Sequence, residues 1–149
     1  MIKNTDYKKN NEKIHKLLGE LAEESFGKEE LNLEDKSQFD EKPEKISLEF
    51  FDNNHSLGGV TGELNPGYMT LKIEFLAVEK EARGKKVGKK LVDEIEKVAK
   101  SKGCKFSFVE TVSFSAPNFY KKLGYVLMFE LEDYPMEGVT NYFFYKKLD

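Results

Sequence analysis

Cysteine, histidine and long apolar runs are scarce in this chain of 149 residues. The single cysteine, Cys104, excludes an internal disulfide, and one cysteine with two histidines makes a poor set of metal ligands. No apolar run approaches the roughly 20 residues that a membrane helix needs, and the polar start MIKNTDYKKNNEK lacks the apolar stretch of a signal peptide. We therefore expect a cytoplasmic protein without a metal or a membrane span.

Two common nucleotide-binding motifs are also absent. The chain contains neither G-x-x-x-x-G-K-[ST] nor G-x-G-x-x-G, so binding of nucleoside triphosphates or dinucleotides loses its main support. The chain does contain many apolar residues: 39% of its residues are hydrophobic and 13% are aromatic. That content is enough for one real core, and we expect a single domain over residues 1–149.

Charge is distributed unevenly along the chain, although its net value is only −3. Residues 83–105 hold nine basic and three acidic side chains, a balance of +6, which leaves −9 for the remainder. Positive potential focused at one site suits an anionic ligand, and negative potential elsewhere suits a cationic one. Ordinary solvated faces also carry charge runs, so charge alone does not decide between a binding site and a plain surface.

Hydrophobic periodicity and turn residues predict an α/β protein. The expected helices cover residues 14–22, 87–99 and 115–124. The expected strands cover residues 46–51, 56–64, 68–78, 104–112, 125–132 and 140–148. The middle helix connects two strands as a βαβ crossover, whose strands should be parallel, and the first three strands should be antiparallel. The acidic stretch 28–45 reads as a loop, and a short helix within it is the alternative.

The stretch ARGKKVGKKL, from Ala82 to Leu91, places two glycines and five cations between a strand and a helix start. Unpaired backbone N–H groups and the positive end of the helix dipole attract anions at such a place. Gly84 and Gly88 allow a ligand to approach the backbone, so a phosphate or pyrophosphate is the natural guest. An ordinary helix start with solubilising lysines is the alternative.

With RGKKVGKKL and APNFYKKLGY at their places in this order of elements, the chain resembles the GNAT superfamily of acetyl-CoA-dependent N-acetyltransferases, as a small bacterial-type member. The resemblance covers residues 46–148. In that family the turn follows Arg/Gln-x-x-Gly-x-Gly/Ala, and its amides bind the pyrophosphate of coenzyme A. This sequence matches at Arg83 and Gly88 and has Lys86 where the middle glycine is usual. The resemblance implies a mixed, mostly antiparallel sheet with helices on both faces and a central βαβ unit.

The resemblance also implies a coenzyme site. Its expected residues are Leu76, Ala77, Val78, Arg83, Gly84, Lys85, Lys86, Val87, Gly88, Lys89, Ser113 and Tyr120. The backbone of residues 76–78 would line pantetheine and hold the thioester oxygen, and Ser113 stands where the family has an asparagine. Tyr120 matches a tyrosine that often protonates the departing thiolate, and simple packing as a helix aromatic is its alternative.

An attacking amine is a cation at neutral pH, so a base must take its proton. Glu74 matches a position where many family members carry a glutamate that acts through water, and Glu110 on the neighbouring strand is the second candidate. A carboxylate that merely faces solvent is the alternative for each. The resemblance implies direct attack of the amine on acetyl-CoA in a ternary complex.

The partner of acetyl-CoA is expected to be a cationic amine, because the chain outside residues 83–105 is acidic. A polyamine, an aminoglycoside-like or streptothricin-like antibiotic, and an amine of a protein all fit, with residues 28–45 and 133–140 as the expected acceptor loops. Nucleic acid and membrane are not expected partners, and homodimers are common in the family. A non-catalytic acyl-CoA sensor or interaction module is the alternative function.

Overall fold

The computed structural model describes residues 1–27 and 42–149, which belong to two compact units. The first unit contains helix α1 (Tyr7–Phe26). Asp6 begins this helix, because its side chain accepts a hydrogen bond from the backbone N–H of Lys9 at 2.9 Å. The helix expected around residues 14–22 is confirmed, and the loop expected over 28–45 lies mostly outside the described residues. Neither α1 nor any other helix in the described ranges combines the length and apolar character that crossing a membrane requires.

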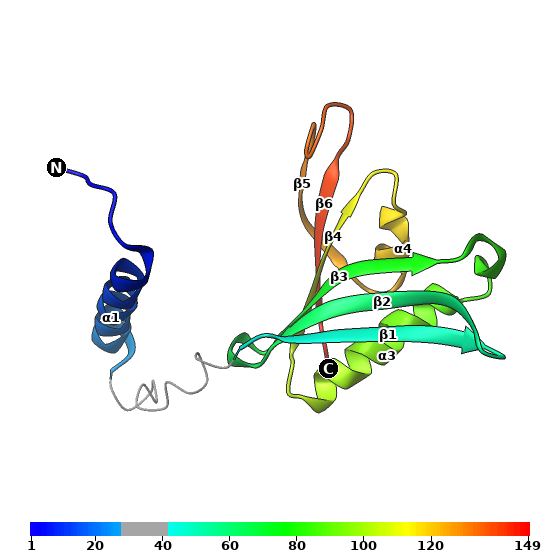
Figure 1. Ribbon diagram of the computed structural model, residues 1–149, viewed down its shortest axis with the longest axis horizontal. Helices are drawn as coiled ribbons and strands as arrows, with labels where there is room; N and C mark the ends of the chain where they lie inside the picture. Colours follow the sequence, from blue (N-terminus) through cyan, green and yellow to red (C-terminus); the bar gives the residue numbers. More distant parts are fainter. Residues whose placement is uncertain (28–41) are drawn as a thin grey trace. The chain divides into compact units, whose positions relative to one another are not determined.

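The second unit is built on a six-stranded sheet in the order β1-β2-β3-β4-β6-β5 (Figure 1). Its strands are β1 (Glu44–Asp52), β2 (His55–Asn65), β3 (Thr70–Val78), β4 (Phe106–Val112), β5 (Val126–Leu131) and β6 (Asn141–Lys147). β3 and β4 run parallel, and every other neighbouring pair is antiparallel. All six strands match expected ones, so the mixed, mostly antiparallel sheet is confirmed.

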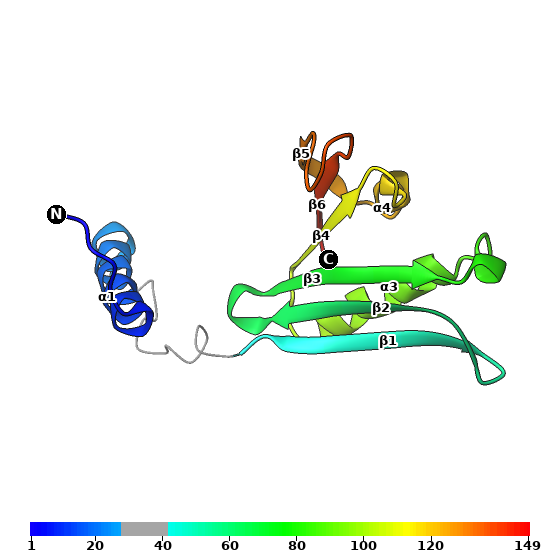
Figure 2. The same cartoon turned by 45° about the horizontal axis from the view of Figure 1, so that its top comes forward.

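Two helices of this unit cover the sheet, α3 (Val87–Ser101) and α4 (Pro117–Lys122). Helix α3 forms the crossover between the parallel strands, and it lies along one face of β1, β2 and β3 (Figures 1 and 2). Its apolar stripe recurs at helical spacing and is buried. Gly62 lets α3 approach β2 closely, since a Cβ at that position would lie 3.1 Å from Ile95 Cδ1.

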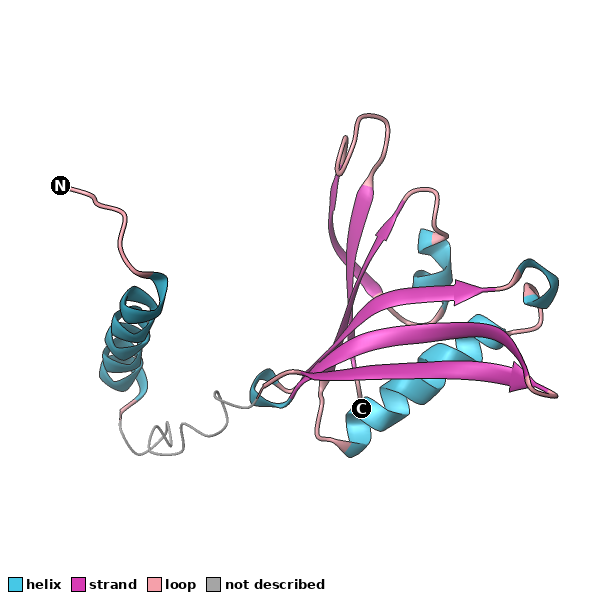
Figure 3. Ribbon diagram, in the orientation of Figure 1, coloured by secondary structure: helices cyan, strands magenta, loops and turns pink. Residues whose placement is uncertain are grey.

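Helix α4 lies on the same face of the sheet as α3. Tyr120 packs against Phe144, which pairs across the sheet with Val109 of β4. Side chains alternate along a strand, so Ser107 shares the face of Val109, and Ser107 joins α3 through the hydroxyl of Tyr125. Figure 3 distinguishes these helices from the strands that they cover. Helices on both faces remain an expectation, because α1 belongs to the other unit.

A buried polar network ties α3 to the second half of the sheet. Tyr125 Oη donates to Glu96 Oε1 at 3.0 Å, so Ser107 Oγ is the donor in its 2.7 Å bond to Tyr125. Lys146 Nζ donates to both carboxylate oxygens of Glu96, at 3.0 and 2.9 Å. Burial raises the pKa of Tyr125, which therefore stays neutral and able to donate. The network joins α3, β4 and β6 to Tyr125, which directly precedes β5.

Candidate active site

The sheet opens between its two parallel strands. β3 and β4 pair only where residues 70–73 face residues 106–109. Beyond that point β3 pairs with β2 alone and β4 pairs with β6 alone, so residues 74–78 and 110–112 diverge. A cavity of about 500 Å³ fills the opening. Its walls are Glu74, Phe75, Leu76, Ala77, Glu110, Thr111, Val112, Ser115, Tyr120, Tyr134, Pro135 and Asn141.

The walls of this cavity come from both faces of the sheet. Thr111 and Tyr120 lie on the face that carries α3 and α4, because Thr111 alternates in step with Val109. Glu110 points to the opposite face. Phe75 does so too, since its neighbour Leu76 packs against the core while Phe75 is 77% exposed. The cavity therefore connects the two faces through the gap between β3 and β4.

The backbone of residues 76–78 borders the gap, and its expected role beside pantetheine stays a prediction. β2 approaches this segment so closely that a Cβ on Gly58 would lie 2.6 Å from the carbonyl oxygen of Ala77. Leu76 and Ala77 line the cavity, whereas Val78 lies one residue further along β3 and packs against the core. β4 has already diverged from this strand edge, so residues 76–78 have no pairing partner in β4.

The turn over residues 83–89 presents backbone amides at the start of α3. Two of its amides are paired, since Arg83 N donates to Lys80 O and Lys85 N donates to Ala82 O, both at 3.3 Å. Within the described part of the chain, no protein acceptor meets the amides of Gly84, Lys86, Val87, Gly88 and Lys89. Free amides beside a helix dipole, with several cations around them, fit an anion such as a pyrophosphate.

Lys86 adopts the backbone conformation that glycine favours. Its φ of 62° and ψ of 18° are left-handed, and it caps α3 without a side-chain hydrogen bond. Lys86 therefore follows a path open to the glycine that is usual there, at a strain cost of about 1 kcal/mol. Gly88 has a different requirement, because a Cβ on it would lie 3.3 Å from the ring of Phe119 in α4. The second glycine of the turn thus allows α3 and α4 to pack.

Replacing Lys86 with glycine should raise the free energy of unfolding by about 0.5 kcal/mol. Relief of the left-handed strain exceeds the extra entropy that glycine gives to the unfolded chain. Lys86→Ala is the matched control, because it removes the same charge and keeps the strain. Urea unfolding of the three proteins measures the difference, and a Lys86→Gly protein less stable than Lys86→Ala would contradict the strain.

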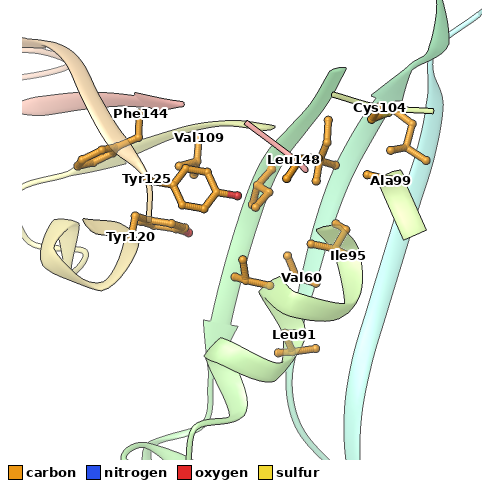
Figure 4. Close-up of a cluster of buried hydrophobic side chains, with 14 of the residues drawn as sticks. Val60, Leu91, Ile95, Ala99, Cys104, Val109, Tyr120, Tyr125, Phe144 and Leu148 are labelled. Atoms are coloured by element: carbon orange, nitrogen blue, oxygen red, sulfur yellow. The ribbon is translucent and has the colours of Figure 1, made fainter. Parts of the chain in front are cut away.

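Tyr120 lies at the end of the cavity, on the side of α4. It is only 6% exposed, and its ring packs edge-on against Tyr125 at a centroid distance of 5.6 Å (Figure 4). Its hydroxyl has no hydrogen-bond partner among the described residues, yet it is not sealed from solvent. Burial raises the pKa of Tyr120 to about 12, so the phenol is neutral near pH 7. An unpaired, neutral hydroxyl at a cavity wall is available as a hydrogen-bond donor.

The two candidate bases have different surroundings. Glu74 Oε1 accepts from Lys45 Nζ at 2.6 Å, and Lys45 also pairs with Glu63 at 2.8 Å. Hydrogen bonds to Glu63 and Glu74 raise the pKa of Lys45, which stays charged. Glu110 has a neutral neighbour instead, because its Oε2 accepts from Asn141 Nδ2 at 3.4 Å. Both carboxylates line the cavity, and Glu110 is the one without a bound cation among the described residues.

Ser113 lies beside the cavity rather than in its wall. Its N–H donates to Thr140 O at 2.8 Å, and its Oγ accepts from Thr140 N at 3.3 Å. This two-point contact joins the end of β4 to the loop between β5 and β6. The coenzyme contact expected for Ser113 stays a prediction, and its polar atoms have a structural use.

Several wall residues escaped the sequence motifs. Thr111 lies near the end of β4 and Ser115 in the turn that follows, and Thr111 Oγ1 donates to Ser115 O at 2.9 Å. Tyr134 and Pro135 come from the stretch DYPMEGV, within the loop 133–140 that was expected to bind the acceptor. The sequence could locate that loop, but no motif singles out these two residues as wall residues. No group of three metal-ligating side chains occurs in residues 1–27 and 42–149.

Comparisons with known proteins agree with this arrangement. The model of the acetyltransferase (GNAT) family matches residues 11–125. A crystal structure of an acetyltransferase from Bacillus cereus ATCC 14579 is 31% identical, with 99% of this chain and 97% of that chain covered and a TM-score of 0.69. An aminoglycoside 6'-N-acetyltransferase complexed with coenzyme A shares the fold at 18% identity and a TM-score of 0.66, over 84% of this chain and 88% of that chain.

A blasticidin-S acetyltransferase of Streptomyces morookaense is 37% identical over 92 residues, which are 61% of this chain. The match spans 65% of that curated relative, slightly less than two thirds of its length. The fold, the opened strand pair and these relatives together define an acetyltransferase. The chain belongs to the GNAT family. The expected family and enzyme class, a GNAT-type acetyltransferase, are confirmed.

Proposed function

We propose that the protein transfers the acetyl group of acetyl-CoA to the primary amine of a cationic acceptor, by direct attack in a ternary complex. The observation that best supports this proposal is the cavity through the sheet, which has Tyr120 on one side and Glu110 on the other. Among residues 1–27 and 42–149, two carboxylates and no cationic side chain line this cavity. An anionic coenzyme at the 83–89 turn and a cationic amine at the far side would therefore meet in the gap.

Residues 83–89 would hold the diphosphate through the five amides without a protein acceptor, helped by Arg83, Lys85, Lys86 and Lys89. The thiol-bearing arm would run along residues 76–78, where a main-chain N–H would stabilise the charge that develops on the thioester oxygen. A family model that matches residues 11–125 spans parts of both units, which supports a single acetyltransferase domain. We also propose that the protein is cytoplasmic, as the sequence suggests.

Glu110 would take the proton from the acceptor ammonium, directly or through water. The free amine would then attack the carbonyl carbon, a C–N bond would form, and the C–S bond would break. Tyr120 would donate a hydrogen bond to the departing sulfur. Complete proton transfer from a phenol of pKa about 12 to a thiolate of pKa about 8.5 is uphill by roughly 5 kcal/mol, so hydrogen bonding precedes transfer.

Thiol release from acetyl-CoA tests the activity across a panel of amines. Blasticidin S and an aminoglycoside come first, because relatives are named for these antibiotics, and a polyamine and a lysine-containing peptide complete the panel. We expect stoichiometric thiol release and an acetylated acceptor with at least one cationic amine. Tight coenzyme A binding without turnover on any amine would favour the acyl-CoA sensor instead.

Glu110→Gln should lower kcat/KM for the amine about 100-fold at pH 7, whereas Glu74→Gln should change it much less. Glu74 is already ion-paired with Lys45, while Glu110 is not ion-paired. The deficit of Glu110→Gln should shrink as pH rises, because more amine is already deprotonated. Steady-state rates between pH 6 and 9.5 measure both effects. A larger loss in Glu74→Gln would reverse the assignment.

A further inference from the structure

Two aromatic side chains line the cavity together with Glu110. Phe75 comes from β3 and Tyr134 from the loop between β5 and β6, and both line the cavity. Phe75 is 77% exposed and Tyr134 is 50% exposed. Large exposed rings at a cavity wall cost free energy in the empty protein, since their apolar faces meet water. Both rings lie where a ligand in the cavity can contact them.

The loop that carries Tyr134 is internally bonded. Tyr134 N donates to Val139 O at 3.0 Å, and Val139 N donates to Met136 O at 3.1 Å. Asp133 Oδ1 accepts from Gly138 N at 2.8 Å. The contact of Ser113 with Thr140 joins this loop to β4, the strand that carries Glu110. A ring held this way loses little conformational freedom when a ligand binds.

The charges around these rings favour a cation. Glu110 provides a carboxylate without a cationic partner among the described residues, and no lysine, arginine or histidine lines the cavity. Aromatic faces attract cations and stack on flat groups. A saturated polyamine would use the carboxylate but would leave both rings without a flat partner.

We propose that Phe75 and Tyr134 form an aromatic acceptor subsite that selects primary amines attached to a flat group, such as an aromatic ring or a guanidinium. Glu110 then receives the ammonium while the rings receive the flat part. Tyr134 is the specificity-determining residue of this pair, because it lies on a loop rather than on a strand that builds the gap. This inference rests on the proposed acetyl transfer to amines.

Benzylamine and cyclohexanemethylamine test the subsite, because both are primary ammonium ions of similar size and only the first carries a flat ring. We expect kcat/KM with acetyl-CoA to favour benzylamine about fivefold. Tyr134→Ala should reduce this preference to near unity, and Tyr134→Phe should keep it. Phe51→Ala is the matched control, since Phe51 is 57% exposed on β1 and does not line the cavity.

Saturation-transfer NMR of both amines with coenzyme A-loaded protein provides a second measurement that needs no turnover. Stronger transfer to benzylamine in the wild type, lost in Tyr134→Ala and kept in Phe51→Ala, supports the subsite. Equal transfer to the two amines, or a preference unchanged in Tyr134→Ala, overturns it. Absence of thiol release with every amine would contradict the proposed function alone, because the binding preference is still measured.

Discussion

Lys146→Met should lower the free energy of unfolding by about 2–3 kcal/mol. The substitution leaves the carboxylate of Glu96, which is only 7% exposed, without its cationic partner. Removing one member of a buried ion pair costs about 3–5 kcal/mol, and a value at or below the lower end is expected because a quarter of the Lys146 side chain is exposed. Tyr125 would remain as the hydrogen-bond donor to Glu96. Urea unfolding followed by circular dichroism measures the change.

The matched control is the double variant Glu96→Met with Lys146→Met, which removes both charges. Replacing a buried pair by apolar side chains is often nearly neutral, so the double variant should recover most of the lost stability. A double variant less stable than Lys146→Met would show that the penalty does not come from an unpaired carboxylate. The loss of the hydrogen bond to Tyr125 limits how complete the recovery can be.

Tyr120→Phe should lower kcat about 100-fold and leave the KM for acetyl-CoA nearly unchanged. The phenol is proposed to act on the departing sulfur, whereas the coenzyme is held by the 83–89 turn. Since burial raises the pKa of Tyr120 to about 12, its ionisation should cause no loss of wild-type activity below pH 11. Steady-state kinetics from pH 6.5 to 10.5 measures the kcat and KM of the variant and the pH dependence of the wild-type activity. Full turnover of the variant across this range would remove Tyr120 from the mechanism.

The raised pKa of Tyr120 also makes the stability of the folded protein depend on pH. Below pH 10 the phenol is protonated in both the folded and the unfolded chain, so the stability linked to its raised pKa is fully present. Between pH 10 and about 12 only the folded protein keeps the proton, and this contribution is lost as pH rises. Tyr120→Phe should therefore lose less stability than the wild type over that interval.

Local patterns were sufficient for the helices and strands and for the turn that precedes α3. The apolar stripe of α3 repeats at helical spacing, and the cations and glycines of the 83–89 turn are contiguous, so both could be predicted from neighbouring residues. The strand, helix and strand order of these elements then predicted that β3 and β4 are parallel. Short-range regularity is what a single sequence displays most clearly.

Contacts between distant residues could not be predicted in this way. Lys45 pairs with Glu74 across 29 residues, and Lys146 pairs with Glu96 across 50, so neither pair leaves a local pattern. Tyr134 reaches the cavity only because of how β5 and β6 pair. The conformation of Lys86 depends on packing around the turn, since lysine by itself disfavours a positive φ.

Titration of ¹⁵N-labelled protein with coenzyme A tests the central claim most directly, because it reports on each backbone amide. The account predicts saturable shifts at the amides of Gly84, Lys86, Val87, Gly88 and Lys89, together with residues 76–78 beside the gap. Coenzyme A that binds while these amides stay unchanged would contradict the site proposed here, and so would a failure of coenzyme A to bind at all.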